Sequence, residues 1–339
     1  MKVAIGHRLQ EGPYGGGNAF VRNLVAALRA DGHTVAFSLE DPDLDFILIT
    51  DPRRRSPNVA FSPGAVLRYV ARHPRTLVVH RINECDERKN TRGMNFLLRT
   101  ANYCADHTVF VGSWLQNLAV TSPRPNPSWS TILNGADPAI FHSRGYRGWD
   151  GIEPLRLVTH HWGGNWNKGF DVYSRLDAML AEPEWRGRIA FTYIGNLPPG
   201  FRFRHADYIP PLAGEQLAEA LRRHHVYVTA SINEPGGNHQ IEGGLCGLPL
   251  IYRDSGCMPE YCEGFGIMFG EKGFENALER MMREYPDHLA HMKEFPHTAE
   301  RTTAAWIALF RELDRCRDTY ISRRKHRASL IRPMLAHLL

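Results

Sequence analysis

Short runs of β-branched and aromatic residues alternate with longer segments of helical periodicity, and the whole pattern occurs twice along the chain. Such alternation is typical of βαβ units, which build parallel sheets. Between the two halves, the segment Ser143–Pro154 is rich in glycine and has no hydrophobic period, so we interpret it as a linker. A chain of 339 residues is long enough for two domains that each bury a core. We therefore predict an α/β protein with two Rossmann-like, doubly wound domains facing a cleft, completed by C-terminal helices.

The predicted elements fill both halves. Strands of the first half are expected at Val3–Gly6, Thr34–Leu39, Phe46–Thr50, Thr76–His80, His107–Val111 and Ser130–Leu133, with helices at Asn18–Ala30, Gly64–Arg72, Arg92–Cys104 and Ser113–Val120. Strands of the second half are expected at Leu155–His160, Ile189–Ile194, Val226–Ala230, Leu250–Tyr252 and Gly266–Phe269, with helices at Phe170–Leu180, Gly214–Arg223, Gln240–Cys246, Glu275–Arg283 and Thr298–Arg317. We place the domains at residues 1–145 and 146–310, followed by a helical tail at 311–339.

The composition, with 43% hydrophobic and 23% charged residues, is that of a soluble globular protein. No apolar run approaches the roughly 20 residues that cross a bilayer, and the N-terminus enters a strand pattern without a signal-peptide core. The six cysteines show no C-x-x-C pair and no zinc spacing, which favours free thiols; a disulfide between Cys257 and Cys262 is the alternative. We expect a cytoplasmic protein without a metal site.

The positive charge of the chain is concentrated at its C-terminus. Residues 315–339 contain seven Lys or Arg against one acid, Asp318, which gives this segment a net charge of +6. The net charge of the whole chain is +5, so the remaining residues sum to −1. Apolar residues from Tyr320 to Leu338 are interleaved with these charges. We interpret the segment either as a solvated terminal helix or as an amphipathic segment attracted to an anionic membrane surface, peripherally on its inner face. Nucleic acid is a third reading, which we do not expect, because no basic stripe with stacked aromatic residues occurs elsewhere.

Gly15, Gly16 and Gly17 precede an amphipathic helix in the first half. Bare backbone N–H groups at the positive end of a helix can approach an anion or a sugar closely, so we predict that these glycines bind substrate. The spacing is not G-x-G-x-x-G, because Phe20 stands in the last glycine's place, although Glu40 lies where a dinucleotide site has its ribose-binding acid. A tight turn without a ligand is the alternative.

The segment after the fourth strand, from His80 to Lys89, is dense in titratable groups. Ligands of open parallel sheets bind outside the carboxyl ends of the strands. We predict His80 as a catalytic residue, because a side chain at the end of a strand is held rigidly, and Asn83 as a substrate contact. A solvated polar loop is the alternative.

Lys168 stands in the second half on a turn rich in glycine, asparagine and tryptophan, directly before a helix. Its charge adds to the helix dipole and N–H groups that already favour phosphate, so we predict diphosphate binding rather than an exposed lysine without a ligand. His161, at the end of the preceding strand, is a further expected substrate contact. No G-x-x-x-x-G-K-[ST] segment is present, which argues against a P-loop NTPase.

Two glutamates, Glu234 and Glu242, stand eight positions apart after the predicted strand Val226–Ala230. We expect Glu234 in the loop and Glu242 about one turn into the helix that begins near Asn238, itself an expected substrate contact. Carboxylates accept paired hydrogen bonds from neighbouring hydroxyls, so the two suit a ligand with two polyol parts, a sugar and a ribose. Spacing alone equally fits two surface acids at the start of a helix.

This stretch resembles a known signature. Glu234, a seven-residue spacer, Glu242 and the turn Cys246–Pro249 resemble the E-x7-E and C-G-x-P segments of retaining GT-B glycosyltransferases, especially family 4. Three further segments resemble the same family in the same order: FVGSWL (Phe110–Leu115), NGADPAIF (Asn134–Phe141) and NKGFD (Asn167–Asp171). The resemblance extends over roughly Met1–Phe269.

The resemblance implies transfer of a sugar from a nucleoside diphosphate donor to an acceptor hydroxyl, with retention of anomeric configuration and without a metal or a further cofactor. The first domain would hold the acceptor and the second the nucleotide sugar. Glu234 and Lys168 would be catalytic residues, Glu234 holding hydroxyls of the donor sugar and Lys168 neutralising the diphosphate. Glu242 would hold the ribose. Backbone amides complete the implied site, around Gly236 and Gly237 and in the Gly15–Gly17 loop.

The chain departs from the family pattern at a few positions. Gly163 stands where an arginine is expected five residues before the lysine, so His160, His161 or Arg81 would take its place or the diphosphate would be held less strongly. Gly236-Gly237 replaces a common Phe-Gly pair, and Gly243 replaces an alanine.

A basic amphipathic tail would bring the enzyme to a lipid-linked acceptor, so the expected role is synthesis of a surface polysaccharide or glycolipid. Two other functions fit parts of the pattern: a nucleotide-sugar epimerase or glycan phosphorylase of similar build, and an NAD-dependent oxidoreductase that uses the Gly15 loop.

Overall fold

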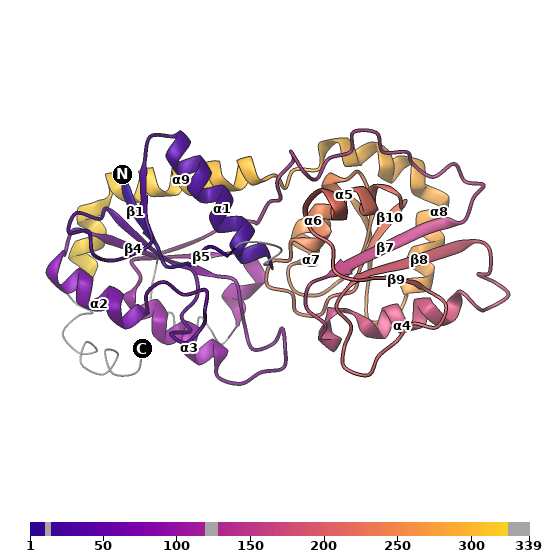
Figure 1. Ribbon diagram of the computed structural model, residues 1–339, viewed down its shortest axis with the longest axis horizontal. Coiled ribbons are helices and arrows are strands. Elements are labelled where there is room, and N and C mark those ends of the chain that lie inside the picture. Colours follow the sequence, from indigo (N-terminus) through magenta and orange to yellow (C-terminus); the bar gives the residue numbers. More distant parts are fainter. Residues whose placement is uncertain (11–14, 119–127, 325–339) are drawn as a thin grey trace. The chain divides into compact units, whose positions relative to one another are not determined.

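The computed structural model describes residues 1–10, 15–118 and 128–324. The chain divides into two compact units, one formed by Met1–Leu133 together with Ala299–Leu339 and the other by Asn134–Thr298. Each unit is built on a six-stranded parallel sheet flanked by helices (Figure 1). The predicted fold class, an α/β protein with two doubly wound sheets, is confirmed.

The first sheet has the strand order β2-β1-β3-β4-β5-β6. Its strands are β1 (Lys2–Ile5), β2 (Thr34–Ala36), β3 (Phe46–Ile49), β4 (Leu77–Ile82), β5 (His107–Phe110) and β6 (Trp129–Thr131). The helices of the N-terminal segment are α1 (Gly15–Ala30), α2 (Pro63–Arg72), α3 (Met94–Ala101) and the 3-10 turns η1 (Asn102–Cys104) and η2 (Ser113–Asn117). Most of these elements match the predicted ones to within a few residues.

The central strands of this sheet are buried on both faces, because their apolar side chains alternate between two cores. Val3 and Ile5 of β1 pack into the core under α1, whereas Ala4 between them packs into the core under α2. Continuous apolar runs in the sequence therefore mark strands covered by helices on both sides.

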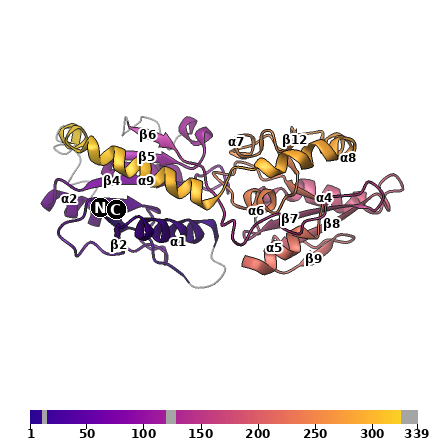
Figure 2. The same cartoon turned by 90° about the horizontal axis from the view of Figure 1, so that it is seen from above.

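Helix α9 (Ala299–Arg315) packs beside α1 on the first unit, as Figures 1 and 2 both show. Its Trp306 ring lies 5.5 Å from that of Phe20, and its Phe310 ring lies 4.9 Å from that of Phe46. Residues 299–310, which the sequence analysis placed in the second domain, thus share the core of the first unit. Sequence position alone does not reveal this return, because an amphipathic helix can cover either sheet.

The second sheet has the strand order β12-β11-β10-β7-β8-β9. Its strands are β7 (Leu155–His161), β8 (Ile189–Gly195), β9 (Asp207–Ile209), β10 (Val226–Thr229), β11 (Leu250–Arg253) and β12 (Gly266–Phe269). Its helices are η4 (Trp166–Lys168), α4 (Phe170–Met179), α5 (Gly214–Arg222), α6 (His239–Leu245), α7 (Met258–Cys262), α8 (Phe274–His291) and η5 (Met292–Glu294). Helices α4 and α8 share one core with β7, β8 and β10.

Four elements of this unit are absent from the sequence prediction: the 3-10 turns η4 and η5, strand β9 and helix α7. Strand β9 is a three-residue edge strand with mostly exposed side chains, and α7 has five residues that begin with Met258-Pro259. Neither is long enough to show a hydrophobic period. The predicted helix Ser113–Val120 is instead a 3-10 turn over Ser113–Asn117, with its last two residues outside the described ranges.

The segment interpreted as a linker is an ordered part of the second unit. The Tyr146 hydroxyl donates to the His225 carbonyl oxygen at 3.0 Å, and the Trp149 indole N–H donates to the Glu153 carbonyl oxygen at 2.6 Å. The chain already enters this unit at Asn134, whose backbone N–H donates to the Tyr261 hydroxyl at 2.7 Å. The first unit therefore ends at Leu133 rather than at residue 145.

The described part of the basic tail lies against the first unit. Tyr320 and Ile321 pack onto the core that α9 covers, and the Tyr320 hydroxyl lies 3.1 Å from Ser128 Oγ. Arg324 forms an ion pair with the buried Asp106, and its Nε–H donates to that carboxylate at 2.8 Å. These side chains contact their own protein, whereas Leu330, Leu338 and the other tail residues from Lys325 onward lie outside the described residues.

Two simpler predictions can be compared with the structure. All six cysteines are free thiols in the structure, and Cys257 and Cys262 form no disulfide. In the described parts of the chain, no helix is long and apolar enough to cross a membrane.

Candidate functional site

The carboxyl edge of the second sheet brings together the candidate side chains of the second half of the sequence. Strand β7 ends at His161, and the loop that follows leads through the turn η4 to Lys168. Gly169, in the left-handed region with φ +102°, then turns the chain into α4. A Cβ at this position would lie 2.5 Å from the Cβ of Ala230, so only glycine lets the loop pass so close to the end of β10.

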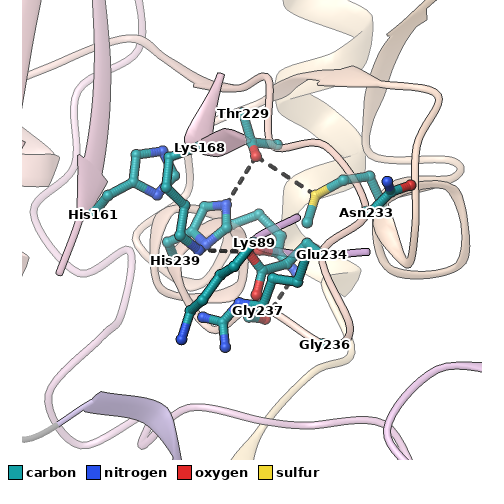
Figure 3. Close-up of polar contacts among 12 residues, drawn as sticks. Lys89, His161, Lys168, Thr229, Asn233, Glu234, Gly236, Gly237 and His239 are labelled. Atoms are coloured by element: carbon teal, nitrogen blue, oxygen red, sulfur yellow. Dashed lines mark hydrogen bonds and ion pairs between the residues drawn. The ribbon is translucent and has the colours of Figure 1, made fainter. Parts of the chain in front are cut away.

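Lys168 and Glu234 form an ion pair between the loops that follow β7 and β10 (Figure 3). The two side chains are only 7% and 5% exposed. Withdrawing two charges from water is costly unless they neutralise each other. Each side chain of the pair therefore offsets part of the cost of burying the other. The structure thus brings together the two residues predicted to hold the diphosphate and the donor sugar.

The backbone of Glu234 is held on both sides. The Ile232 N–H donates to the Asn167 carbonyl oxygen at 2.7 Å and so joins the two loops, and the Cys257 N–H donates to the Glu234 carbonyl oxygen at 2.9 Å. Asn233 directly before it adopts φ +52°, a left-handed conformation that asparagine tolerates better than most residues. Such a fixed loop holds the carboxylate in one place, as a binding site requires.

Glu242 lies in the first turn of α6 and accepts a hydrogen bond from His160 Nε2 at 2.7 Å. The other ring nitrogen, Nδ1, lies 3.1 Å from the Tyr227 hydroxyl on β10. The Glu242 side chain keeps 17% of its surface exposed, more than that of Glu234. The two glutamates therefore differ in their hydrogen-bond partner and in the exposure of their side chains.

His161 and His239 form a second buried cluster near Lys168 and Glu234 (Figure 3). Their ring centroids lie 4.5 Å apart. His161 Nε2 lies 2.8 Å from the Tyr173 hydroxyl, and His239 Nε2 lies 2.8 Å from Thr229 Oγ1. The side chain of His161, predicted as a substrate contact, is thus held by a hydrogen bond within the second unit.

The turn between the glutamates is tied to the protein through its carbonyl groups. Gly236 accepts a hydrogen bond from Asn134 Nδ2 at 2.7 Å, and Gly237 accepts one from Gln240 Nε2 at 2.8 Å. A Cβ on Gly237 would lie 2.7 Å from the His239 ring, so glycine is required there. Asn238, expected to contact substrate, directly precedes α6, and its side chain makes no capping hydrogen bond.

Gly163, where the resemblance implies an arginine, lies beside Lys168. A Cβ added to it would make only ordinary contacts, at 3.5 Å to Asn165 Nδ2 and 3.6 Å to Lys168 Cε. The two histidines expected to replace the arginine are engaged elsewhere, His160 with Glu242 and His161 with Tyr173.

The predicted residues of the first unit lie at its own strand ends and helix start. Gly15, Gly16 and Gly17 form the first turn of α1 rather than a loop before it, and residues 11–14 are outside the described ranges. The helix start is anchored by Asn18, whose Oδ1 accepts from the Gln10 N–H and whose Nδ2 donates to the Gln10 carbonyl, both at 2.9 Å. Asn83 is half-buried directly after β4.

His80, predicted as catalytic, is completely buried. Its Nδ1 lies 3.0 Å from Asn102 Oδ1, and burial lowers the pKa of the imidazole to about 4. It has no exposed surface through which to touch a substrate, and its side chain lies in the core of the first unit. Arg81, the next residue, faces the opposite side of β4 and lies 4.1 Å above the Phe20 ring.

Tyr227 and Asn134 belong to the site but were not predicted as site residues. Tyr227 lies in an apolar strand pattern, where an aromatic residue is normally read as core. The one available signal was Gly243 in place of the alanine that the resemblance implies, since a Cβ there would overlap the Tyr227 ring. In the part of the chain that the structure describes, no cluster of three or more His, Cys, Asp or Glu side chains is arranged to hold a metal ion.

The chain resembles solved structures over most of its length. Sucrose-phosphate synthase from Thermosynechococcus elongatus is 15% identical, with 92% of this chain and 98% of that chain covered and a TM-score of 0.61. HepE of Anabaena, solved in complex with UDP, is 12% identical, with 92% and 100% covered and a TM-score of 0.65. AviGT4, a glycosyltransferase of avilamycin A biosynthesis, is 14% identical, with 92% and 98% covered and a TM-score of 0.58.

No protein-family model and no curated protein sequence matches the chain. The structural similarity shows that the two units form the GT-B fold predicted from the sequence.

Proposed function

We propose that the protein is a retaining, metal-independent glycosyltransferase that moves a sugar from a nucleoside diphosphate donor to an acceptor hydroxyl. The buried ion pair of Lys168 and Glu234, with Glu242 on the adjacent helix, is the observation that carries the proposal. One cation and two carboxylates match the three polar parts of such a donor: a diphosphate, a sugar and a ribose.

Donor binding would exchange the partners of the ion pair. The β-phosphate would receive the Lys168 ammonium, and hydroxyls of the donor sugar would donate to the Glu234 carboxylate. The ammonium would then face a new negative charge and the carboxylate would keep hydrogen-bond donors, which lowers the cost of opening a buried pair. Glu242 would accept hydrogen bonds from the ribose hydroxyls through the oxygen that His160 does not occupy.

In the reaction, the bond between the anomeric carbon and the phosphate oxygen breaks and a bond to the acceptor oxygen forms on the same face. The positive charge on the sugar ring and the negative charge on the departing diphosphate need electrostatic stabilisation, which Lys168 and backbone amides supply. The departing phosphate oxygen takes the acceptor proton. This step needs no protein base, in keeping with the buried position of His80.

Features of similar proteins support a uridine nucleotide as the first donor to test. HepE of Anabaena was solved with UDP-glucose, and the pneumococcal O-GlcNAc transferase GtfA with UDP and GlcNAc. The acceptor would contact the first unit. We further propose a surface polysaccharide or glycolipid precursor as the acceptor class and an anionic membrane surface as the partner of the tail beyond Arg324.

A thermal-shift panel of UDP, GDP, ADP and CDP sugars, repeated with Glu242→Ala, tests donor binding. At least one nucleotide sugar should raise the melting temperature of the wild type and not of the variant. If no nucleotide gives a Glu242-dependent shift, the proposal is wrong. With the donor identified, NMR of the product formed on a defined oligosaccharide or lipid-linked acceptor should show the donor's anomeric configuration, whereas turnover without an acceptor would indicate an epimerase.

A further inference from the structure

The carboxylate of Glu242 belongs to a chain of hydrogen bonds that runs back into the sheet. His160 on β7 connects it to Tyr227 on β10, with bonds of 2.7 Å and 3.1 Å at the two ring nitrogens. We propose that His160 is a positioning residue for Glu242 and that, with Tyr227, it makes the site selective for a ribonucleotide over its deoxy counterpart. The inference rests on the proposed function, in which Glu242 receives the ribose.

The direction of each hydrogen bond follows from the groups involved. A carboxylate accepts hydrogen bonds and donates none, so Nε2–H of His160 donates to Glu242. In the neutral imidazole, Nδ1 is then an acceptor for the Tyr227 hydroxyl, which has the His160 carbonyl oxygen at 3.3 Å as a second acceptor. The Tyr227 oxygen in turn accepts from the His160 backbone N–H at 3.1 Å. Both ring nitrogens of His160 and its backbone N–H thus have hydrogen-bond partners.

The Tyr227 hydroxyl stays a donor because it is fully buried. Burial raises the pKa of this phenol well above its ordinary value, so the hydroxyl keeps its proton. A tyrosine fixed in the core and a histidine with only 10% of its side chain exposed leave the imidazole little freedom to turn. Glu242 is therefore held by a rigid donor rather than by a mobile surface group.

The position of Tyr227 depends on a small residue in the facing helix. Gly243 follows Glu242 on α6, and a Cβ there would overlap the Tyr227 ring. Glycine at this position thus admits the aromatic side chain that orients His160. The combination of Tyr227, His160 and Gly243 accounts for the departure from the family's alanine.

Fixing one carboxylate oxygen leaves the other to the ligand. A carboxylate already ordered in its binding orientation loses less side-chain freedom when a ligand arrives. Hydroxyls of a ribose can donate to it in a defined geometry, and a ligand that lacks one of them leaves part of this acceptor unused. Loss of His160 should therefore weaken ribose recognition more than it weakens diphosphate recognition.

The experiment compares ribonucleoside diphosphates with their 2′-deoxy and 3′-deoxy forms by calorimetry. UDP, GDP, ADP and CDP are screened first, and the tightest one is used throughout. The wild type should bind the ribonucleotide at least about tenfold more tightly than one of the deoxy forms, the ratio expected for one hydrogen bond to a charged group. In His160→Gln this ratio should fall to about threefold or less, and in Tyr227→Phe, which loses only the hydroxyl, it should lie in between.

His224→Gln is the matched control, because His224 is a buried histidine of the same unit with two hydrogen bonds of 2.9 Å, to Ala220 and Thr192. It should keep the wild-type ratio. A second pair of variants replaces adjacent glycines of α6: Gly243→Ala presses on Tyr227 and should lower the ratio, whereas Gly244→Ala presses on Phe295 and should not.

Three results would overturn the inference. One is an equal loss of affinity for both nucleotide forms in His160→Gln, which would mark a merely structural role. Another is a wild type that does not distinguish the two forms. If His160→Gln does not fold, an unchanged ratio in Tyr227→Phe and Gly243→Ala decides against the inference. Absence of any Glu242-dependent nucleotide binding is a different outcome. It would contradict the proposed function, whereas the three results above contradict only the role of His160.

Discussion

Lys168 and Glu234, 66 positions apart in the chain, form a buried ion pair at the carboxyl edge of the second sheet. Their loops are joined by a backbone hydrogen bond of 2.7 Å from Ile232 to Asn167, so the pair is part of the folded structure of the unit. The residues proposed to bind the donor are thus also residues on which the stability of the unit depends.

Removing one partner of this pair should destabilise the protein strongly. Glu234→Gln leaves the buried ammonium without its counter-charge, and we expect a loss of about 3–5 kcal/mol in the free energy of unfolding. The double variant Lys168→Met/Glu234→Gln, which removes both charges, should be more stable than Glu234→Gln while remaining inactive. Urea denaturation measures both values.

Glu284→Gln is the control for this experiment, because the Arg280–Glu284 pair of 2.9 Å lies on the surface. Its effect should stay within about 0.5 kcal/mol. Lys168→Met is measured alone as well, and a double variant as unstable as the two single losses added together would contradict a direct Lys168–Glu234 interaction.

Gly163→Arg should strengthen the binding of nucleoside diphosphates. The new side chain would start beside Lys168 without a clash and could pair with the diphosphate through two N–H groups. We expect a gain in affinity of about tenfold over Gly163→Ala, measured by calorimetry at low salt. The gain should shrink as the salt concentration rises.

The adjacent glycine is the matched control. A Cβ on Gly164 would lie 2.5 Å from the Leu197 carbonyl oxygen, so Gly164→Ala should lower stability and improve no affinity. Equal affinities of Gly163→Arg and Gly163→Ala would show that position 163 does not face the diphosphate.

His80 should contribute to acid denaturation and not to turnover. Burial holds its pKa at about 4, below the ordinary value of 6.5, so the unfolded chain binds a proton that the folded chain does not between these pH values. The resulting stability is complete above pH 6.5 and is lost as the pH falls toward 4, at up to about 1.4 kcal/mol per pH unit.

His80→Gln should make the stability less dependent on pH in this window, measured by urea denaturation at pH 7, 6 and 5. The exposed His291 serves as a control, and His291→Gln should keep the wild-type slope. A large loss of turnover at pH 7 in a folded His80→Gln protein would restore the catalytic role predicted from the sequence.

Truncations at two points should separate the structural and the membrane roles of the tail. Deleting residues 320–339 removes the Tyr320–Ser128 and Arg324–Asp106 contacts and leaves the buried Asp106 without this cation, so the melting temperature should fall by several degrees. Deleting residues 325–339 keeps both contacts. This shorter truncation should keep the melting temperature and turnover on a soluble acceptor but lose sedimentation with anionic vesicles.

Unchanged sedimentation of the 325–339 deletion would rule out a membrane role for this segment. Arg324→Gln in the full chain separates the ion pair from the rest of the tail and should account for part of the loss of stability.

Local sequence was enough to predict the repeated βαβ pattern, the candidate loops after β7 and β10, and the spacing of Glu234 and Glu242. These features are local, because hydrophobic periodicity and short loop motifs lie within a few tens of residues. For the same reason the short β9 and α7 were missed, since neither is long enough to show a period.

The tertiary structure alone decided which of these side chains meet. Pairing of β10 with β7 places Tyr227 opposite Val158, and His160 lies two residues further on the same face of β7. That register brings His160 between Tyr227 and the helix that carries Glu242, and a shift by one residue would turn His160 to the other face. The return of α9 to the first unit and the burial of His80 likewise depend on packing between segments far apart in the chain. Local sequence patterns specify the type of each element, whereas contacts over such separations follow from register and packing.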